Sequence, residues 1–154
     1  PLHAAKTELL ISLDELEEIH QFQIIFYNDS PSLFNPAGES PRMWWADNRG
    51  KNVATRFIQG ISAVGATEHM SALEMALRLQ PDVIFFLTDA TQPELTASQL
   101  ARLRRMNGGA TSIHAIEFGL GPASGANNFL RQLAQQHSGH YAYVDVSRPG
   151  REVR

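Results

Sequence analysis

The feature that most constrains the fold is a continuous apolar run at residues 83–87, Val-Ile-Phe-Phe-Leu, which leads directly into Thr88 and Asp89. Runs of β-branched and aromatic residues predict strands, and a run without polar alternation predicts a strand buried on both faces of a parallel sheet. In open α/β sheets, ligands bind outside the carboxyl ends of the strands. Asp89 is therefore the first candidate for a functional residue.

Strand and helix patterns alternate along the rest of the chain. Further strands are predicted at residues 22–27, 32–34, 112–118 and 140–146. Apolar residues at three- and four-residue spacing predict helices at residues 2–19, 47–59, 68–79, 97–106 and 127–137. This alternation predicts an α/β fold with a three-layer, doubly wound and mainly parallel sheet. We expect one domain over residues 1–146, followed by a polar tail at residues 147–154.

Local signals mark the ends of several helices. Pro1 suits a first helical turn, where its missing N–H would be unbonded in any case. Thr96 and Gln99 have the spacing of a capping box, and Gly108 closes the helix that follows. Gly139 is expected to end the helix at residues 127–137.

Composition and charge exclude several classes of protein. The net charge of −3 provides no field for nucleic acid, and the arginines at 102, 104 and 105 accompany no aromatic row. The chain has no cysteine, which excludes disulfides, thiolate metal sites and cysteine nucleophiles. No apolar run approaches the roughly 20 residues of a membrane span. None of these features assigns a compartment.

Thr67 is the second candidate for a functional residue. It lies in a Gly-Ala-Thr loop before a predicted helix, on the same side of the sheet as Asp89 if the connections run strand, helix, strand. Hydroxyl and carboxylate oxygens are the ligands that Mg²⁺ prefers, although two oxygens are too few for a site. The residue types leave a plainer interpretation open, in which Thr67 caps its helix and Asp89 forms a turn with residues 90–93.

Other candidate sites are weaker. None of the six histidines forms a His-Glu-x-x-His motif, and we expect His114 to be a bonded residue of a strand. The glycine-rich loop at residues 119–125 lacks the Lys-Ser/Thr of a P-loop. Gly-x-Ser-x-Gly is absent, and a receiver-like phosphoacceptor would need a second acidic group and a nearby lysine. We therefore expect no enzymatic activity.

Trp44 and Trp45 follow a loop rich in proline and glycine. Neighbouring residues of an extended segment face opposite ways, so one ring is expected in the core and the other partly exposed. An exposed tryptophan could anchor a partner, whereas two buried rings would only fix the loop to the domain.

The run GATEHMSALEMALRLQPDVIFFLTDA, together with IHAIEFGLG and NFLRQLAQQHSGHYAYVDV, closely resembles the von Willebrand factor type A domain, particularly its bacterial versions. The resemblance covers residues 1–146. It implies a Rossmann-like sheet with a metal-ion-dependent adhesion site. Thr67 would bind Mg²⁺, or Mn²⁺ as a substitute, directly, and Asp89 would act through a water. A protein ligand would supply an aspartate or glutamate to the ion.

The chain departs from the family pattern because it contains no Asp-x-Ser-x-Ser motif, which the family carries on its first strand. The segment at residues 28–32, Asn-Asp-Ser-Pro-Ser, fails the spacing and follows the second strand. We expect that the first central strand is missing from this sequence and that the metal site is incomplete. An extracytoplasmic, membrane-tethered parent protein is implied by the resemblance alone. The alternative function is a metal-independent scaffold in which Thr67 and Asp89 only cap local structure.

Overall fold

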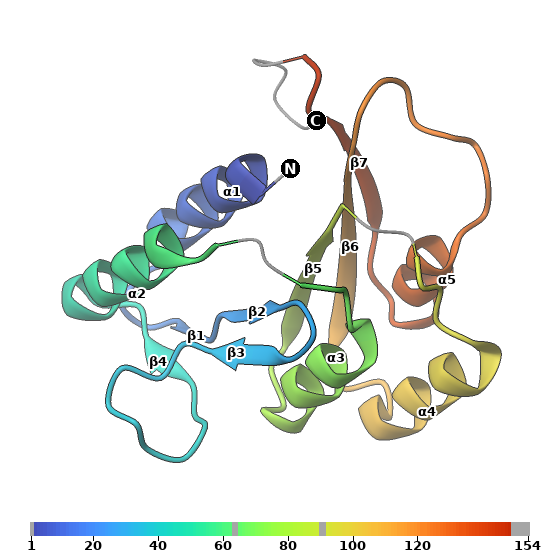
Figure 1. The fold of residues 1–154 in the computed structure, drawn as a ribbon. Helices are drawn as coiled ribbons and strands as arrows, with labels where there is room; N and C mark the ends of the chain where they lie inside the picture. The colour runs from blue at the N-terminus through green and yellow to red at the C-terminus, as the bar shows by residue number, and fades with distance from the viewer. Residues whose placement is uncertain (1, 63–64, 90–91, 149–154) are drawn as a thin grey trace. The chain divides into compact units, whose positions relative to one another are not determined.

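The computed structural model describes residues 2–62, 65–89 and 92–148 (Figure 1). The chain divides into two compact units, Leu2–Ala72 and the residues from Leu73 onward, so that the boundary falls within a helix, α3 (His69–Arg78). Most of the polar tail expected at residues 147–154 lies outside the described residues. Within the described ranges, no helix combines the length and the apolar character needed to cross a membrane.

The N-terminal unit holds two helices and two small antiparallel sheets. Its elements in chain order are α1 (Leu2–Glu15), β1 (Gln21–Phe22), β2 (Ile25–Tyr27), β3 (Pro31–Leu33), β4 (Trp44–Trp45) and α2 (Asn48–Gly60). Strand β1 pairs with β4, and β2 pairs with β3. The core is rich in aromatic rings, with Phe34 stacked on Phe22 at 5.8 Å between centroids.

The continuous strand predicted at residues 22–27 is wrong, because β1 and β2 are separate. Gln23 explains the break: its Nε2 donates to the carbonyls of Phe34 and Arg42, and its Oε1 accepts from the N–H of Ile24. The side-chain amide of Gln23 thus takes the place of strand pairing in the segment that separates β1 from β2. The short strand predicted near residues 32–34 is confirmed as β3.

The first helix is shorter than predicted, ending at Glu15 rather than at Ile19. Lys51 Nζ donates to the carbonyls of Asp14 (2.9 Å) and Leu16 (2.5 Å), which satisfies acceptors that a longer helix would use. The chain then turns, and Ile19 is 75% exposed rather than part of a buried helical face.

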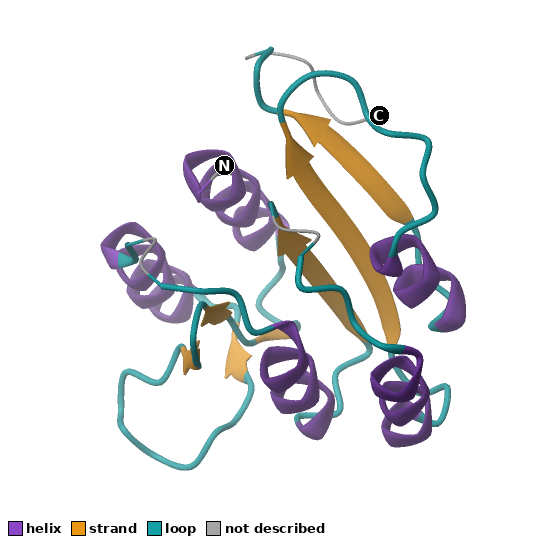
Figure 2. Ribbon diagram, turned by 45° about the vertical axis from the view of Figure 1, so that its right-hand side comes forward, coloured by secondary structure: helices purple, strands orange, loops and turns teal. Residues whose placement is uncertain are grey.

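The C-terminal unit contains a parallel sheet with the order β5-β6-β7 (Figure 2). Its elements are β5 (Val83–Thr88), α4 (Ala97–Asn107), β6 (Ser112–Gly119), α5 (Phe129–Gln136) and β7 (Tyr141–Asp145). Helix α5 packs against β6 and β7. A parallel sheet flanked by helices confirms the predicted α/β class.

The prediction that the strand at residues 83–87 is buried on both faces is wrong, because one face of β5 is largely exposed. Phe86 is buried, but Phe85 is 62% exposed and Val83 is 42% exposed. The Phe85 ring stacks on the imidazole of His114, with 5.3 Å between centroids and 19° between planes. Alternate residues of the apolar run therefore face outward.

Helix ends agree with the sequence signals at α4 and differ at α5. Thr96 and Gln99 form the predicted capping box, and Gly108 has the left-handed conformation (φ 58). Helix α5 instead ends at Gln136 with His137 as its C-cap, and the left-handed residue is Ser138 (φ 55) rather than Gly139. Gly139 instead lies against the backbone of β6, close to the carbonyl of Ile113.

Candidate functional site

The loop that carries Thr67 is held by the turn between β2 and β3. The N–H of Ala66 donates to Asp29 Oδ1 at 2.7 Å, and the N–H of Glu68 donates to the carbonyl of Asn28 at 2.8 Å. Gly65 has φ +100, and a Cβ there would lie 2.5 Å from Asp29 Oδ2. Glycine is therefore required next to the Asp29 carboxylate, and the backbone on both sides of Thr67 is fixed.

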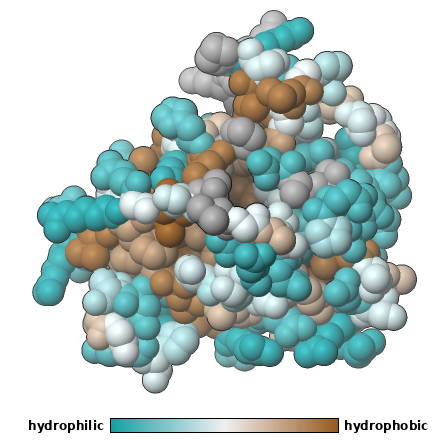
Figure 3. All heavy atoms as spheres, in the orientation of Figure 1, coloured by the Kyte–Doolittle hydropathy of each residue, from teal (hydrophilic) through white to brown (hydrophobic). Residues whose placement is uncertain are grey.

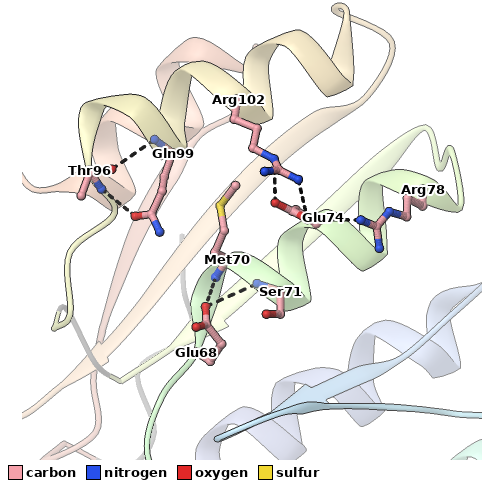
Figure 4. A network of polar contacts seen from close by, with 8 residues as sticks. All are labelled: Glu68, Met70, Ser71, Glu74, Arg78, Thr96, Gln99 and Arg102. Atoms are coloured by element: carbon pink, nitrogen blue, oxygen red, sulfur yellow. Dashed lines mark hydrogen bonds and ion pairs between the residues drawn. The ribbon is translucent and has the colours of Figure 1, made fainter.

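Glu68, rather than Thr67, provides the side-chain acceptor at the start of α3. Its Oε1 accepts from the N–H groups of Met70 (2.9 Å) and Ser71 (3.4 Å), as Figure 4 shows. Within the described part of the chain, the Thr67 hydroxyl has no hydrogen-bond partner. The half-buried Thr67 is thus held in place by its backbone, while its hydroxyl is uncommitted to capping.

Asp29 is a residue that the sequence does not single out. The segment around it fails the spacing of the family motif, and a turn is a sufficient explanation for an Asn-Asp-Ser-Pro run. Its contact with Ala66 spans 37 positions along the chain, so local patterns carry no signal for it. The structure brings Asp29 and the Thr67 loop together as a single polar region.

Replacing Asp29 should loosen this loop. In Asp29→Ala the N–H of Ala66 loses its acceptor, and we expect a loss of about 1 kcal/mol in local stability. Asp29→Asn keeps an oxygen acceptor and should keep most of the protection. Amide hydrogen exchange at Ala66 measures the difference, with Asp82→Ala as a control in the other unit. Equal exchange in the Ala and Asn variants would contradict a positioning role for Asp29.

Three carboxylates lie near the carboxyl ends of the parallel strands: Asp89 after β5, Glu117 on β6 and Asp145 on β7. Glu117 Oε2 accepts from the Tyr141 hydroxyl (2.5 Å) and from Asn128 Nδ2 (3.1 Å). Asp145 Oδ1 accepts from the N–H of Gly121 and from both donors of Ser147. Two of the three are thus bound into local structure.

The electrostatics of these groups follow from the same contacts. Burial, reinforced by the hydrogen bond to Glu117, raises the pKa of Tyr141 to about 12, so its hydroxyl remains a donor. Hydrogen bonds from Ser147 lower the pKa of Asp145. The Tyr141 hydroxyl therefore remains a donor to Glu117, and the Asp145 carboxylate remains the acceptor for Ser147.

Asp89 differs from its two neighbours. It is exposed, it directly follows the last residue of β5, and its carboxylate has no hydrogen bond or ion pair with any residue in the described ranges. The predicted turn with residues 90–93 falls partly on residues 90 and 91, which lie outside the described residues. Among the three carboxylates at this end of the sheet, Asp89 is therefore the one that no described residue binds, and it is available to a ligand.

Thr67 belongs to the N-terminal unit and Asp89 to the C-terminal unit, whose relative positions are not determined. Their convergence on one ion therefore stays a prediction. Among the residues that the structure describes, no group of three or more His, Asp or Glu side chains could hold a metal ion. Their oxygens suit Mg²⁺ in kind but not in number, so any ion would need further donors.

The remaining sequence candidates have structural explanations. His114 is a bonded strand residue, as predicted: its Nδ1 accepts from the N–H of His140. The tryptophan pair divides as expected. Trp44 packs against the core and Phe34, whereas Trp45 is 54% exposed.

Comparisons with known proteins support the fold. No family model matches the sequence, and no curated protein matches it. Among solved structures, a von Willebrand factor type A protein from Catenulispora acidiphila aligns with a TM-score of 0.77 at 19% identity over 93% of this chain. Proximal thread matrix protein 1 from the mussel byssus aligns with a TM-score of 0.61 at 19% identity over 95% of this chain. The chain therefore has the von Willebrand factor type A fold.

These neighbours are much longer than this chain. The alignments cover 34% of the Catenulispora chain and 37% of the mussel chain. The chain thus spans about a third of each neighbour.

Proposed function

We propose that this chain is part of a protein-interaction module that binds an acidic partner through Mg²⁺ at the carboxyl ends of its strands. The observation that carries the proposal is the exposed Asp89 carboxylate, which has no hydrogen bond or ion pair with any described residue. The carboxylates of Glu117 and Asp145, at the same end of the sheet, are both hydrogen-bonded within the unit. Ligand sites of open α/β sheets lie at this end of the strands. The fold itself is consistent with such a module.

Thr67 and Asp89 have different roles in this proposal. The Thr67 hydroxyl, on a loop fixed by Asp29 and Asn28, would bind the ion directly. Asp89 would orient a water of the ion. Residues 1–154 contain no Asp-x-Ser-x-Ser segment, so the ion would need donors beyond Thr67 and the water held by Asp89. The ion would supply the positive charge that an aspartate or glutamate of the partner recognises.

The test is a Mn²⁺ titration, by isothermal titration calorimetry, of the protein as its gene encodes it. Asp89→Ala should weaken Mn²⁺ affinity by about 10–100-fold, the usual effect of losing a group that orients a metal ligand. Thr67→Ala should do the same, and Thr67→Ser should retain binding because the hydroxyl remains.

Asp82→Asn is the matched control, because Asp82 is also exposed but lies at the opposite end of β5. It should leave Mn²⁺ affinity unchanged. If the protein binds no Mn²⁺, or if Asp82→Asn and Asp89→Ala behave alike, the proposal fails. The metal-independent scaffold would then stand, and its partner binding would be indifferent to EDTA.

A further inference from the structure

An exposed apolar pair lies on the N-terminal unit, on residues that the proposed metal site does not use. Ile19 is 75% exposed and Trp45 is 54% exposed. The Trp45 backbone pairs with Gln21, and the N–H of Ala46 donates to the carbonyl of His20 at 2.9 Å. Trp45 therefore lies beside the chain that leads out of the Ile19 turn. We call Ile19 and Trp45 the apolar pair.

The backbone that presents the apolar pair is anchored on both sides. Ile19 is at the tip of a turn closed by two bonds: the N–H of His20 donates to the carbonyl of Glu17, and the N–H of Glu17 donates to His20 Nδ1. Leu16 before the turn and Phe22 after it pack in the core. Because this backbone is already ordered, binding would not have to order the loop, which favours the use of its side chains as anchors.

Trp45 is fixed in the same way. Trp44 before it packs in the core, and Ala46 after it is 1% exposed. Turn tips are usually polar, and tryptophan is among the residues most enriched in the energetic centres of interfaces. An exposed β-branched residue at a turn tip and an exposed indole on the strand paired with the chain after that turn are therefore better explained by a partner than by packing within the unit.

The surroundings of the apolar pair are acidic. Glu17 and Glu18 belong to the turn. Asp47 lies two residues after Trp45 and caps α2 by accepting from the N–H of Gly50. All three residues are exposed. The ammonium group of Lys51 is held by the carbonyls at the end of α1. The exposed cations nearest to Trp45 in the sequence are Arg42, which is ion-paired with Glu39 at 3.3 Å, and Arg49. In Figure 3, hydrophobic residues reach the surface among hydrophilic ones over α1 and α2.

We propose that the apolar pair and its acidic rim, Glu17, Glu18 and Asp47, form a docking surface for a basic segment of a partner protein that inserts an apolar side chain. Charge complementarity selects this occupant, because carboxylates attract lysine and arginine and repel anionic lipid and nucleic acid. A second copy that used the same surface would bring a second set of these carboxylates against them, which disfavours that occupant. This surface goes beyond the proposed metal-dependent function and needs no ion.

The test measures the binding of a fluorescently labelled synthetic Lys-Leu peptide by anisotropy, in EDTA. Trp45→Ala should weaken binding by about tenfold or more, as expected for a central aromatic anchor. Glu17→Gln combined with Glu18→Gln should weaken binding several-fold and reduce its dependence on salt. Because EDTA removes any metal-dependent binding, this result is independent of the fate of the proposed Mg²⁺ site.

Two control variants match these changes in the other unit. Leu120→Ala removes a side chain that is 78% exposed, and Glu94→Gln removes an exposed carboxylate. Both should leave binding unchanged. Circular dichroism checks the fold of Trp45→Ala, and Ile19→Ser provides a second test of the apolar pair.

Several results would overturn the proposal. These are equal binding of a Glu-Leu peptide, no loss in Trp45→Ala and Ile19→Ser, or an equal loss in Leu120→Ala. Self-association that depends on Trp45, seen by sedimentation, would assign the surface to a second copy instead. Trp45-dependent binding to phosphatidylserine vesicles would assign it to lipid.

Discussion

Gly139→Ala should unfold much of the C-terminal unit. A Cβ at Gly139 would lie 1.7 Å from the carbonyl oxygen and 2.4 Å from the carbonyl carbon of Ile113. Both atoms belong to the backbone of the central strand β6, so no side chain can move aside. We expect a loss of about 3 kcal/mol or more in the free energy of unfolding, the upper range for overpacking.

The close approach at Gly139 is fixed by contacts on either side of it. The N–H of Ile113 donates to the carbonyl of His137, and the N–H of Ala115 donates to the carbonyl of His140. The segment from α5 to β7 therefore cannot withdraw from β6 without breaking these bonds.

Gly60→Ala is the matched control for Gly139→Ala. A Cβ at Gly60 meets nothing within 4 Å, and Gly60 is the last residue of α2. The same added methyl group should be neutral or slightly stabilising there. Urea unfolding of both variants gives the comparison. Similar free energies of unfolding for the two variants would contradict the close packing at Gly139.

Gly139 also illustrates where sequence reasoning stops. A glycine after a helical pattern predicts a helix end, and α5 does end nearby. The residue is nevertheless needed for its small size rather than for a left-handed backbone. That requirement comes from Ile113 on β6, 26 positions earlier in the chain, so no local sequence pattern predicts it.

The parts of the fold that could be predicted are those whose signals are local. The capping box of Thr96 and Gln99 and the left-handed Gly108 depend on neighbours within a few positions. The break at Gln23 depends instead on tertiary contacts with Phe34 and Arg42. The 62% exposure of Phe85 depends on how much of the chain packs over that face of β5, which the residues of the apolar run do not encode. Periodicity alone could not distinguish these outcomes.

The candidate site was predictable only in outline. The position of Asp89 followed from the end of an apolar run, because strand ends are visible in sequence. Two features of the site could not be predicted: Glu68 is the acceptor at the start of α3, and Asp29 contacts the Thr67 loop. Several oxygens compete for the same N–H groups, and the sequence does not say which of them binds. The residue types indicate which oxygens could bind a metal ion, and the structure shows which of these oxygens already accept hydrogen bonds.

A buried polar network should make the protein acid-sensitive. Asn107 Nδ2 donates to the carbonyl of Thr111 and lies 2.7 Å from His137 Nδ1, while Asn107 Oδ1 accepts from the N–H of Thr111. These bonds fix the orientation of the amide, so His137 Nδ1 must be an acceptor and the ring must be neutral. A second proton on His137 would face the N–H of Asn107 without an acceptor.

The sign of the pH effect follows from the shift at His137. Burial first, and the charge of Arg104 second, lower the pKa of folded His137 below its ordinary value of 6.5. The unfolded chain therefore takes up the proton at a higher pH than the folded chain. Stability from neutral His137 is fully present above about pH 6.5 and declines as the pH falls, by at most about 1.4 kcal/mol per pH unit.

His137→Asn isolates this contribution, because an amide oxygen can still accept from Asn107 but does not titrate. Urea unfolding between pH 7.5 and pH 5 should show the wild type losing stability faster than His137→Asn. Asn107→Ala should destabilise the protein at every pH by about 3 kcal/mol, since it leaves the buried Thr111 N–H and carbonyl without their partner. If the free energy of unfolding has the same pH dependence in wild type and His137→Asn, the folded protein accommodates the charged imidazole. The hydrogen bond with Asn107 would then not keep His137 neutral.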